Sequence, residues 1–158
     1  MLFRSDRTAS ETDYSHIRNK QIGFVFQDHR LLPQYTALEN ILLPTLAYNS
    51  KTSAEEAYYA HHLMELTRIS GVSNQYPYTL SGGEACRVAV CRALIMKPLL
   101  VLADEPTGQL DGENAINIAS LLSEINKSIQ TTIIMVTHSD EISSFAQRIL
   151  TLQEGKLQ

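Results

Sequence analysis

The sequence has no tryptophan and only two cysteines, Cys86 and Cys91, in 158 residues. The two cysteines lie five positions apart in a stretch that predicts a helix, and this spacing places them on different faces of that helix. A disulfide or a metal site built on the pair is therefore not expected, and we interpret both as small helix residues. Without a disulfide framework, the reducing cytoplasm is the expected compartment.

Long apolar runs and a strong charge of either sign are also missing. The apolar run between Pro98 and Asp104 is far shorter than the roughly 20 residues that a transmembrane helix needs. The N-terminal stretch MLFRSDRTASETDY lacks the apolar core of a signal peptide. A net charge of −4 and a pI near 5.7 give no general nucleic-acid footprint, so no nucleic-acid partner is expected. The length suits one compact domain.

The most informative stretch is residues 78–111, YTLSGGEACRVAVCRALIMKPLLVLADEPTGQLD. Its first part predicts the start of a helix, because Ser81 can cap the helix and Glu84 can complete a capping box with it. Gly82 and Gly83 let backbone N–H groups approach an anion closely, and the helix N-terminus adds partial positive charge. The spot therefore suits a phosphate group.

The second part of this stretch predicts a strand that ends in two acids. Residues 99–103, LLVLA, form a short continuous apolar run, which is typical of a parallel strand buried on both faces. Asp104 and Glu105 follow at the carboxyl end of the strand, where open α/β sheets keep their ligand sites. One of these carboxylates can hold a hydrated Mg²⁺, and the other can orient or deprotonate a water molecule.

Two further strands are predicted to end in polar side chains. Residues 22–26 form a β-rich apolar strand that ends in Gln27, and residues 131–137 form a buried strand that ends in His138. Between the last two strands, residues 112–130 predict a helix that Asp111 caps. An apolar stripe marks its buried face: Ala115, Ile118, Ala119, Leu122 and Ile125.

The remaining elements are predicted more weakly. Residues 1–19 are expected to be a polar loop. Thr36 with Glu39 and Ser53 with Glu56 carry cap signals, so helices are expected to start there. A short helix over residues 141–147 and a final strand over residues 149–152 complete the chain.

The order of these motifs resembles the ABC-type ATPase domain from about residue 17 to the end. In that family's terms, LSGGE is the signature motif, Leu110-Asp111 is the D-loop, and LLVLAD is the Walker B strand. The segments IGFVFQ and TALENILLP are similar to the branch that contains lipoprotein-releasing, macrolide-exporting and cell-division ATPases. In the signature helix this chain has Ala85, Cys86 and Cys91 where such relatives usually carry two glutamines and an alanine.

The resemblance implies an α/β fold, a three-layer P-loop (RecA-like) core with a helical subdomain. It implies one domain over residues 1–158, with the helical subdomain at about 28–78 and the core at about 20–27 and 79–158. It also implies ATP and Mg²⁺ as cofactors. The resemblance implies catalysis by Glu105, His138 and Gln27. It implies metal binding by Asp104 and Gln27. A further set is implied to contact the nucleotide of a second subunit: Ser81, Gly82, Gly83, Glu84 and Asp111.

One motif of this family is not in the sequence, which contains no GxxxxGK[ST] phosphate-binding loop. We therefore expect the chain to be an N-terminally incomplete ATP-binding subunit. The full subunit is expected to dimerise as a homodimer or heterodimer, to bind a transmembrane permease, and to lie on the cytoplasmic face of the cell membrane. Two alternatives stay open: a non-hydrolysing module that donates its signature motif to a partner's P-loop, and a chromosome or DNA-repair ATPase, whose usual long heptad-rich insertions are not found here.

Overall fold

The computed structural model describes residues 10–158. Its centre is a sheet of three parallel strands in the order β1-β2-β3, namely Ile22–Val25, Leu100–Asp104 and Thr132–Val136. The register pairs Phe24 with Leu102, and Leu102 with Ile134. Because all three strands run in the same direction, their carboxyl ends meet at one edge of the sheet. The α/β class predicted from the sequence is confirmed.

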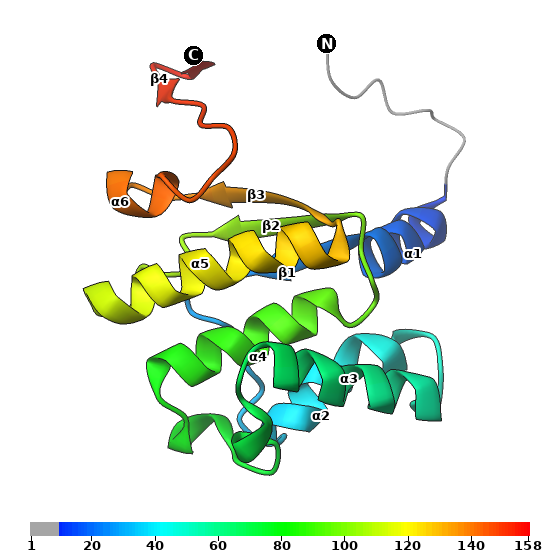
Figure 1. Ribbon diagram of the computed structural model, residues 1–158. Coiled ribbons are helices and arrows are strands. Elements are labelled where there is room, and N and C mark those ends of the chain that lie inside the picture. The colour runs from blue at the N-terminus through cyan, green and yellow to red at the C-terminus, as the bar shows by residue number, and fades with distance from the viewer. Residues whose placement is uncertain (1–9) are drawn as a thin grey trace.

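Helices form two further layers on one side of the sheet (Figure 1). The layer next to the sheet holds α4 (Gly82–Leu94) and α5 (Gly112–Ile129), and α2 (Ala37–Leu42) and α3 (Ala54–Leu66) pack against α4 on its far side. The remaining elements are short, except for α1 before β1: α1 (Glu11–Gln21), η1 (Leu43–Ala47), η2 (Ser70–Val72), η3 (Pro77–Thr79), α6 (Asp140–Ser143), β4 (Leu152–Gln153) and β5 (Lys156–Leu157).

The predicted cap signals are confirmed as complete capping boxes. Thr36 with Glu39, Ser53 with Glu56 and Ser81 with Glu84 each exchange side-chain and backbone hydrogen bonds at the start of α2, α3 and α4. Asp111 caps α5 by accepting from the backbone N–H of Asn114. Each box satisfies N–H groups that the first helical turn leaves without intrahelical partners.

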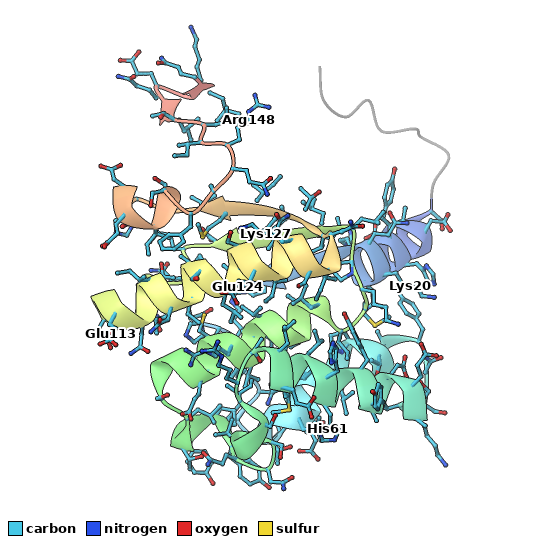
Figure 2. All side chains as sticks on the ribbon, viewed as in Figure 1. Lys20, His61, Glu113, Glu124, Lys127 and Arg148 are labelled. Carbon is cyan, nitrogen blue, oxygen red and sulfur yellow. The ribbon has the colours of Figure 1, made fainter. Side chains whose placement is uncertain are left out.

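The apolar stripe of α5 is confirmed as part of the core. Its five residues are all buried, and Ile118 and Ile125 are completely so. The opposite side of the helix carries exposed charged side chains, among them Glu113, Glu124 and Lys127 (Figure 2). This division of the helix surface fixes the face that α5 presents to the sheet and to α4.

The sheet is less buried than the sequence predicts. On the face away from α4 and α5, the exposed fractions are 39% for Phe24, 53% for Ile134 and 58% for Val136. The interpretation of β2 as a strand buried on both faces and of β3 as a buried strand was therefore wrong. Leu100 and Leu102 of β2 are only half-buried, and none of residues 10–158 covers this second face fully. Leu99, which we expected to begin β2, lies outside the strand and is 72% exposed.

Three other expectations need correction. Residues 11–19, expected to be loop, belong to helix α1, which Ser10 and Asp13 cap with another capping box; residues 1–9 of that predicted loop lie outside the described residues. The helix predicted over 141–147 is the four-residue α6. Of the strand predicted over 149–152, only Leu152 belongs to a strand, β4, which pairs with β5 in a small antiparallel hairpin.

Candidate functional site

Three strand ends bring the predicted catalytic residues to one edge of the sheet. Gln27 follows β1, Asp104 ends β2 with Glu105 directly after it, and His138 follows β3. The parallel direction of the strands makes this convergence a consequence of topology, since the carboxyl ends of parallel strands share an edge. Residues that are more than a hundred positions apart in sequence thus face one region.

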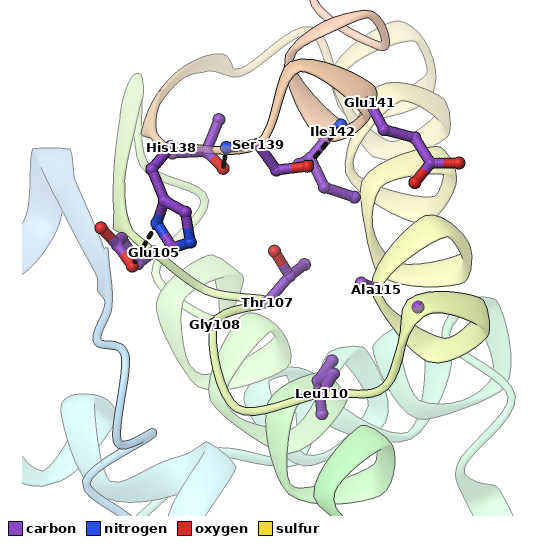
Figure 3. Close-up of a pocket in the computed structure, with 11 residues that line it drawn as sticks. Glu105, Thr107, Gly108, Leu110, Ala115, His138, Ser139, Glu141 and Ile142 are labelled. Atoms are coloured by element: carbon purple, nitrogen blue, oxygen red, sulfur yellow. Dashed lines mark hydrogen bonds and ion pairs between the residues drawn. The ribbon is translucent and has the colours of Figure 1, made fainter.

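Glu105 and His138 are in direct contact at this edge. Nδ1 of His138 lies 3.0 Å from Oε2 of Glu105, with the His138 side chain 76% exposed and the Glu105 side chain 28% exposed (Figure 3). The backbone fixes Glu105, because its N–H donates to the carbonyl of Val136 at 3.0 Å and its own carbonyl accepts from the N–H of Gly108 at 2.9 Å. Glu105 has a φ of +41°, a conformation that residues other than glycine rarely adopt.

The turn after Glu105 lets Gln27 approach the acid. A Cβ atom at Gly108 would lie 3.2 Å from Nε2 of Gln27 and 3.3 Å from Oε2 of Glu105, so both side chains reach the same small space beside this glycine. A cavity of about 200 Å³ adjoins it, between the Glu105 turn, the start of α5 and α6 (Figure 3). Thr107, Gly108 and Ser139 are among its lining residues.

The start of α4 is the second predicted part of the site. Oγ of Ser81 donates to Oε2 of Glu84 at 2.7 Å, and the backbone N–H of Ser81 donates to the same oxygen at 2.8 Å. These two hydrogen bonds hold the pKa of Glu84 below its ordinary value. Ser81 and Gly82 are exposed, so this helix start, with its partial positive charge, faces solvent.

The loop before α5 packs against the start of α4. A Cβ atom at Gly82 would lie 3.1 Å from Cδ2 of Leu110, and one at Gly83 would lie 3.2 Å from Oδ1 of Asn114. Nδ2 of Asn114 in turn donates to Oδ2 of Asp111 at 2.8 Å. Hydrogen bonds from the Asn114 backbone and side chain lower the pKa of Asp111. The two glycines therefore allow the start of α4 and the loop before α5, which resemble the signature motif and the D-loop, to touch within one chain.

The cysteines of α4 are free and buried, and each touches a different neighbour. Sγ of Cys86 lies 3.3 Å from the carbonyl oxygen of Pro106, in the turn after Glu105, and Sγ of Cys91 lies 3.2 Å from Oγ1 of Thr67. Burial raises the pKa of both thiols to about 12. They therefore stay protonated at neutral pH and act as packing residues, as the sequence predicts.

The side chains at the strand ends fit a magnesium ion whose other ligands are water molecules and phosphate oxygens. Asp104 and Glu105 offer carboxylate oxygens and Gln27 offers an amide oxygen, which are the hard ligands that Mg²⁺ prefers. Among residues 10–158 no group of three or more His, Cys, Asp or Glu side chains could hold a metal by itself.

Sequence reasoning missed three contributors to this site: Thr107, Gly108 and Ser139. A glycine three positions after a predicted catalytic acid is a sequence signal for a close approach, and it could have indicated Gly108. Thr107 and Ser139 gave no such signal, because hydroxyl residues in loops are common. Their place in the cavity depends on α6, whose position is set by tertiary packing.

Comparison with known proteins places these features in a family. The family model described as ABC transporter matches residues 3–108. The chain is 43% identical over 148 residues to the lipoprotein-releasing system ATP-binding protein LolD of Pseudoalteromonas translucida, covering 94% of this chain and 63% of that protein. It is 42% identical to the LolD protein of Psychrobacter arcticus, covering 92% of this chain and 65% of that protein. The chain thus spans less than two thirds of the length of these relatives.

Solved structures agree with the sequence relatives. A dimeric structure of the ATP-binding cassette MJ0796 in a post-hydrolysis state bound to ADP and Pi matches with a TM-score of 0.80 at 36% identity. The match covers 95% of this chain and 66% of the solved one. Among residues 10–158, no helix combines the length and the apolar character needed to cross a bilayer.

Proposed function

The chain belongs to the ABC transporter family, and we propose that it forms the greater part of an ATP-hydrolysing subunit that powers export or lipoprotein release through a membrane partner. The 43% identity to a lipoprotein-releasing ATP-binding protein supports this choice of transport class. In this proposal residues 28–78 act as the helical subdomain. The subunit would lie on the cytoplasmic face of the membrane through its permease partner.

One observation carries the proposal: the contact of 3.0 Å between Glu105 and His138 at the carboxyl ends of neighbouring strands. A carboxylate in this place can orient a water molecule and accept its proton, while the imidazole fixes the orientation of the carboxylate. With Nδ1 turned to Glu105 and the side chain 76% exposed, Nε2 of His138 can face the γ-phosphate. The residues supply position and electrostatic stabilisation rather than a covalent intermediate.

Asp104 and Gln27 would hold the magnesium ion in this proposal. When bound, the ion neutralises charge on the phosphate oxygens and orients the nucleotide. Gln27 lies beside Glu105 and directly before the loop that leads to α2, so it can report occupancy of the site to a membrane partner. Ser81, Gly82, Gly83, Glu84 and Asp111 would act on the nucleotide held by a second subunit, in a homodimer or heterodimer.

A chimera tests the proposal. The N-terminal part of the Pseudoalteromonas translucida relative is joined to this chain, and ATP turnover is measured in the wild-type chimera and in its Glu105→Gln variant. We expect the wild-type chimera to hydrolyse ATP and the variant to lose roughly 10²–10⁴-fold in turnover, because an amide cannot accept the proton of water. The variant should also accumulate as an ATP-bound dimer in gel filtration.

Glu113→Gln is the matched control, because Glu113 is an exposed glutamate in the first turn of α5. Its turnover should equal that of the wild-type chimera. Unchanged turnover in Glu105→Gln would refute the catalytic role of Glu105. The complete relative from Pseudoalteromonas translucida is measured in the same assay. If it hydrolyses ATP and the wild-type chimera does not, the proposed ATPase function is refuted.

A second candidate function has its own supporting observation, the lack of a GxxxxGK[ST] motif in this sequence. In that case the chain would hydrolyse nothing itself and would lend its signature motif to the P-loop of another cassette. Adding the chain to a P-loop-bearing cassette with a disabled signature motif would then restore turnover. The Ser81→Arg variant should not restore it, because a bulky cation blocks the start of α4.

A further inference from the structure

The guanidinium group of Arg92, in the last turn of α4, binds two consecutive backbone carbonyls from a distant part of the chain. Nη2 donates to the carbonyl of His29 at 2.6 Å, and Nη1 donates to the carbonyl of Arg30 at 2.7 Å. Both are short, charge-assisted hydrogen bonds made by one planar fork. They join the end of α4 to the loop that starts with Gln27.

The loop has an unusual backbone conformation at the two residues that Arg92 holds. The φ angles of His29 and Arg30 are +57° and +45°. Side-chain-bearing residues adopt this left-handed region rarely, and two in succession need support from their surroundings. Within the loop, the N–H of His29 donates to the carbonyl of Phe26 at 2.9 Å. The fork of Arg92 supplies the support from outside the loop.

The side chains of the same loop are held as well. His29 is 6% exposed, and within the described part of the chain its Nδ1 atom has no hydrogen-bond partner. Arg30 pairs with Asp28 at 3.2 Å and stacks over the ring of Phe26 at 4.5 Å. Among the described residues, the two contacts of Arg92 are the hydrogen bonds that join this loop to α4.

The position of Arg92 along α4 gives this contact a further meaning. Ser81 caps one end of α4 and Arg92 lies near the other, about 16 Å away at the helical rise of 1.5 Å per residue. One continuous helix therefore connects the signature motif to the loop of Gln27. A rigid helix with a fixed attachment at each end moves both attachments together.

We propose that Arg92 is a positioning residue that locks the loop of residues 27–30 to α4, so that Gln27 and the signature helix behave as one rigid body. A change at the strand ends that moves Gln27 then also moves Ser81, and the reverse holds. The value of this coupling to transport rests on the proposed function. The lock itself does not, because it requires neither nucleotide nor partner.

Nuclear magnetic resonance of the 158-residue chain tests the lock through the Arg92→Lys variant. Lysine keeps the charge but is a single point donor, so it cannot bind both carbonyls in the plane of a fork. We expect hydrogen exchange at the amide of His29 to accelerate roughly 10-fold or more, the effect of losing one charge-assisted hydrogen bond. Residual dipolar couplings of residues 27–30 should fit the alignment of α4 in the wild type and fail to fit it in the variant.

Arg18→Lys is the matched control, because Arg18 makes an exposed ion pair with Glu11 and lies outside α4. It should leave the exchange of His29 and the dipolar couplings unchanged. Amides in the middle of α5 provide an internal reference: a merely structural loss of stability would accelerate them as much as His29, and this outcome would overturn the proposal.

Arg92→Gln, which removes the charge, is a second variant with a larger perturbation. If it fails to fold, the Arg92→Lys result alone decides. The proposal would also be overturned if, in Arg92→Lys, the dipolar couplings of residues 27–30 still fit the alignment of α4 and hydrogen exchange at the amide of His29 is unchanged. Neither outcome bears on the ATPase activity of the chimera, so failure of the lock and failure of the proposed function can be told apart.

Discussion

Replacing Gly23 by alanine should destabilise the fold strongly, because β1 approaches α4 too closely for any side chain. Gly23 is buried in the middle of β1, opposite Val101 of β2. A Cβ atom at this position would overlap the carbonyl oxygen of Ala93 and would lie 3.2 Å from the Cβ atom of Ala93. The atoms in the way belong mainly to the backbone of α4, so no rotamer change can relieve the overlap.

The size of the effect follows from how overpacked cores respond. Inserting a methyl group into a packed interior costs typically about 1–3 kcal/mol, and the upper end applies where backbone must move. With a urea m-value of about 1–3 kcal/mol/M for a small protein, a loss of about 3 kcal/mol lowers the unfolding midpoint by about 1–3 M. Moving α4 away from β1 also displaces Arg92, which directly precedes Ala93, so the loop of Gln27 should loosen in the same variant.

Urea unfolding followed by circular dichroism measures this loss, with Gly112→Ala as the control. Gly112 is the first residue of α5, and a Cβ atom there would meet nothing within 4 Å. Alanine is favoured over glycine in helices by up to about 1 kcal/mol, so this variant should keep or slightly gain stability. Surface substitutions usually change the free energy of unfolding by less than about 0.5 kcal/mol. If the free energy of unfolding of Gly23→Ala differs from that of the wild type by no more than this, the close approach of β1 and α4 is refuted.

Three more predictions concern the start of α4 and the nucleotide. Ser81→Ala should lower the free energy of unfolding by about 1 kcal/mol in urea titrations, since it removes a helix cap; an unchanged midpoint would contradict the capping box. The hydrogen bonds of Ser81 lower the pKa of Glu84 in the folded state. The stabilisation from the ionised Glu84 is therefore complete above pH 4.5, the ordinary pKa of a glutamate, and it is lost as the pH falls through the lower pKa of the folded state. The stability difference between Ser81→Ala and wild type should therefore narrow below pH 4.5, and a constant difference would disprove the link. The 158-residue chain alone should bind Mg-ATP at millimolar or weaker affinity in isothermal titration, because losing P-loop contacts of roughly 1.5–3 kcal/mol each weakens a micromolar site by at least a thousandfold; micromolar binding would mean that another part of this chain grips the nucleotide.

Local sequence signals predicted much of this fold. The capping boxes at Thr36, Ser53 and Ser81 depend on residues three positions apart, so the sequence contains all the information that they need. The same is true of the stripe of α5, whose period is that of the helix itself. Helix α1 (Glu11–Gln21) was missed, although Ser10 and Asp13 form a capping box at its start, because a mainly polar helix shows no apolar period.

Long-range features could not be read from the sequence in the same way. The exposure of Ile134 and Val136 depends on what covers the sheet, and an apolar strand reads the same whether or not its second face is covered. The resemblance to ABC-type ATPases named Gln27, Glu105 and His138, but only the structure shows that Glu105 and His138 touch. The contacts of Arg92 with His29 and Arg30 join residues more than sixty positions apart, and no local pattern announces them.

The backbone of Glu105, the proposed catalytic residue, has a conformation that costs folding free energy. At a φ of +41°, glycine or asparagine would fit with less strain, and relief at a single such position is typically of order 1 kcal/mol. Selection for folding stability alone would therefore replace this glutamate. Glu105→Gly would therefore rank among the first substitutions to try for a more stable protein. The same substitution would remove the side chain that pairs with Nδ1 of His138 within the described residues. Under the proposed function, in which Glu105 orients the attacking water, the residue that gives the most stable fold at this position is therefore not the residue that gives activity.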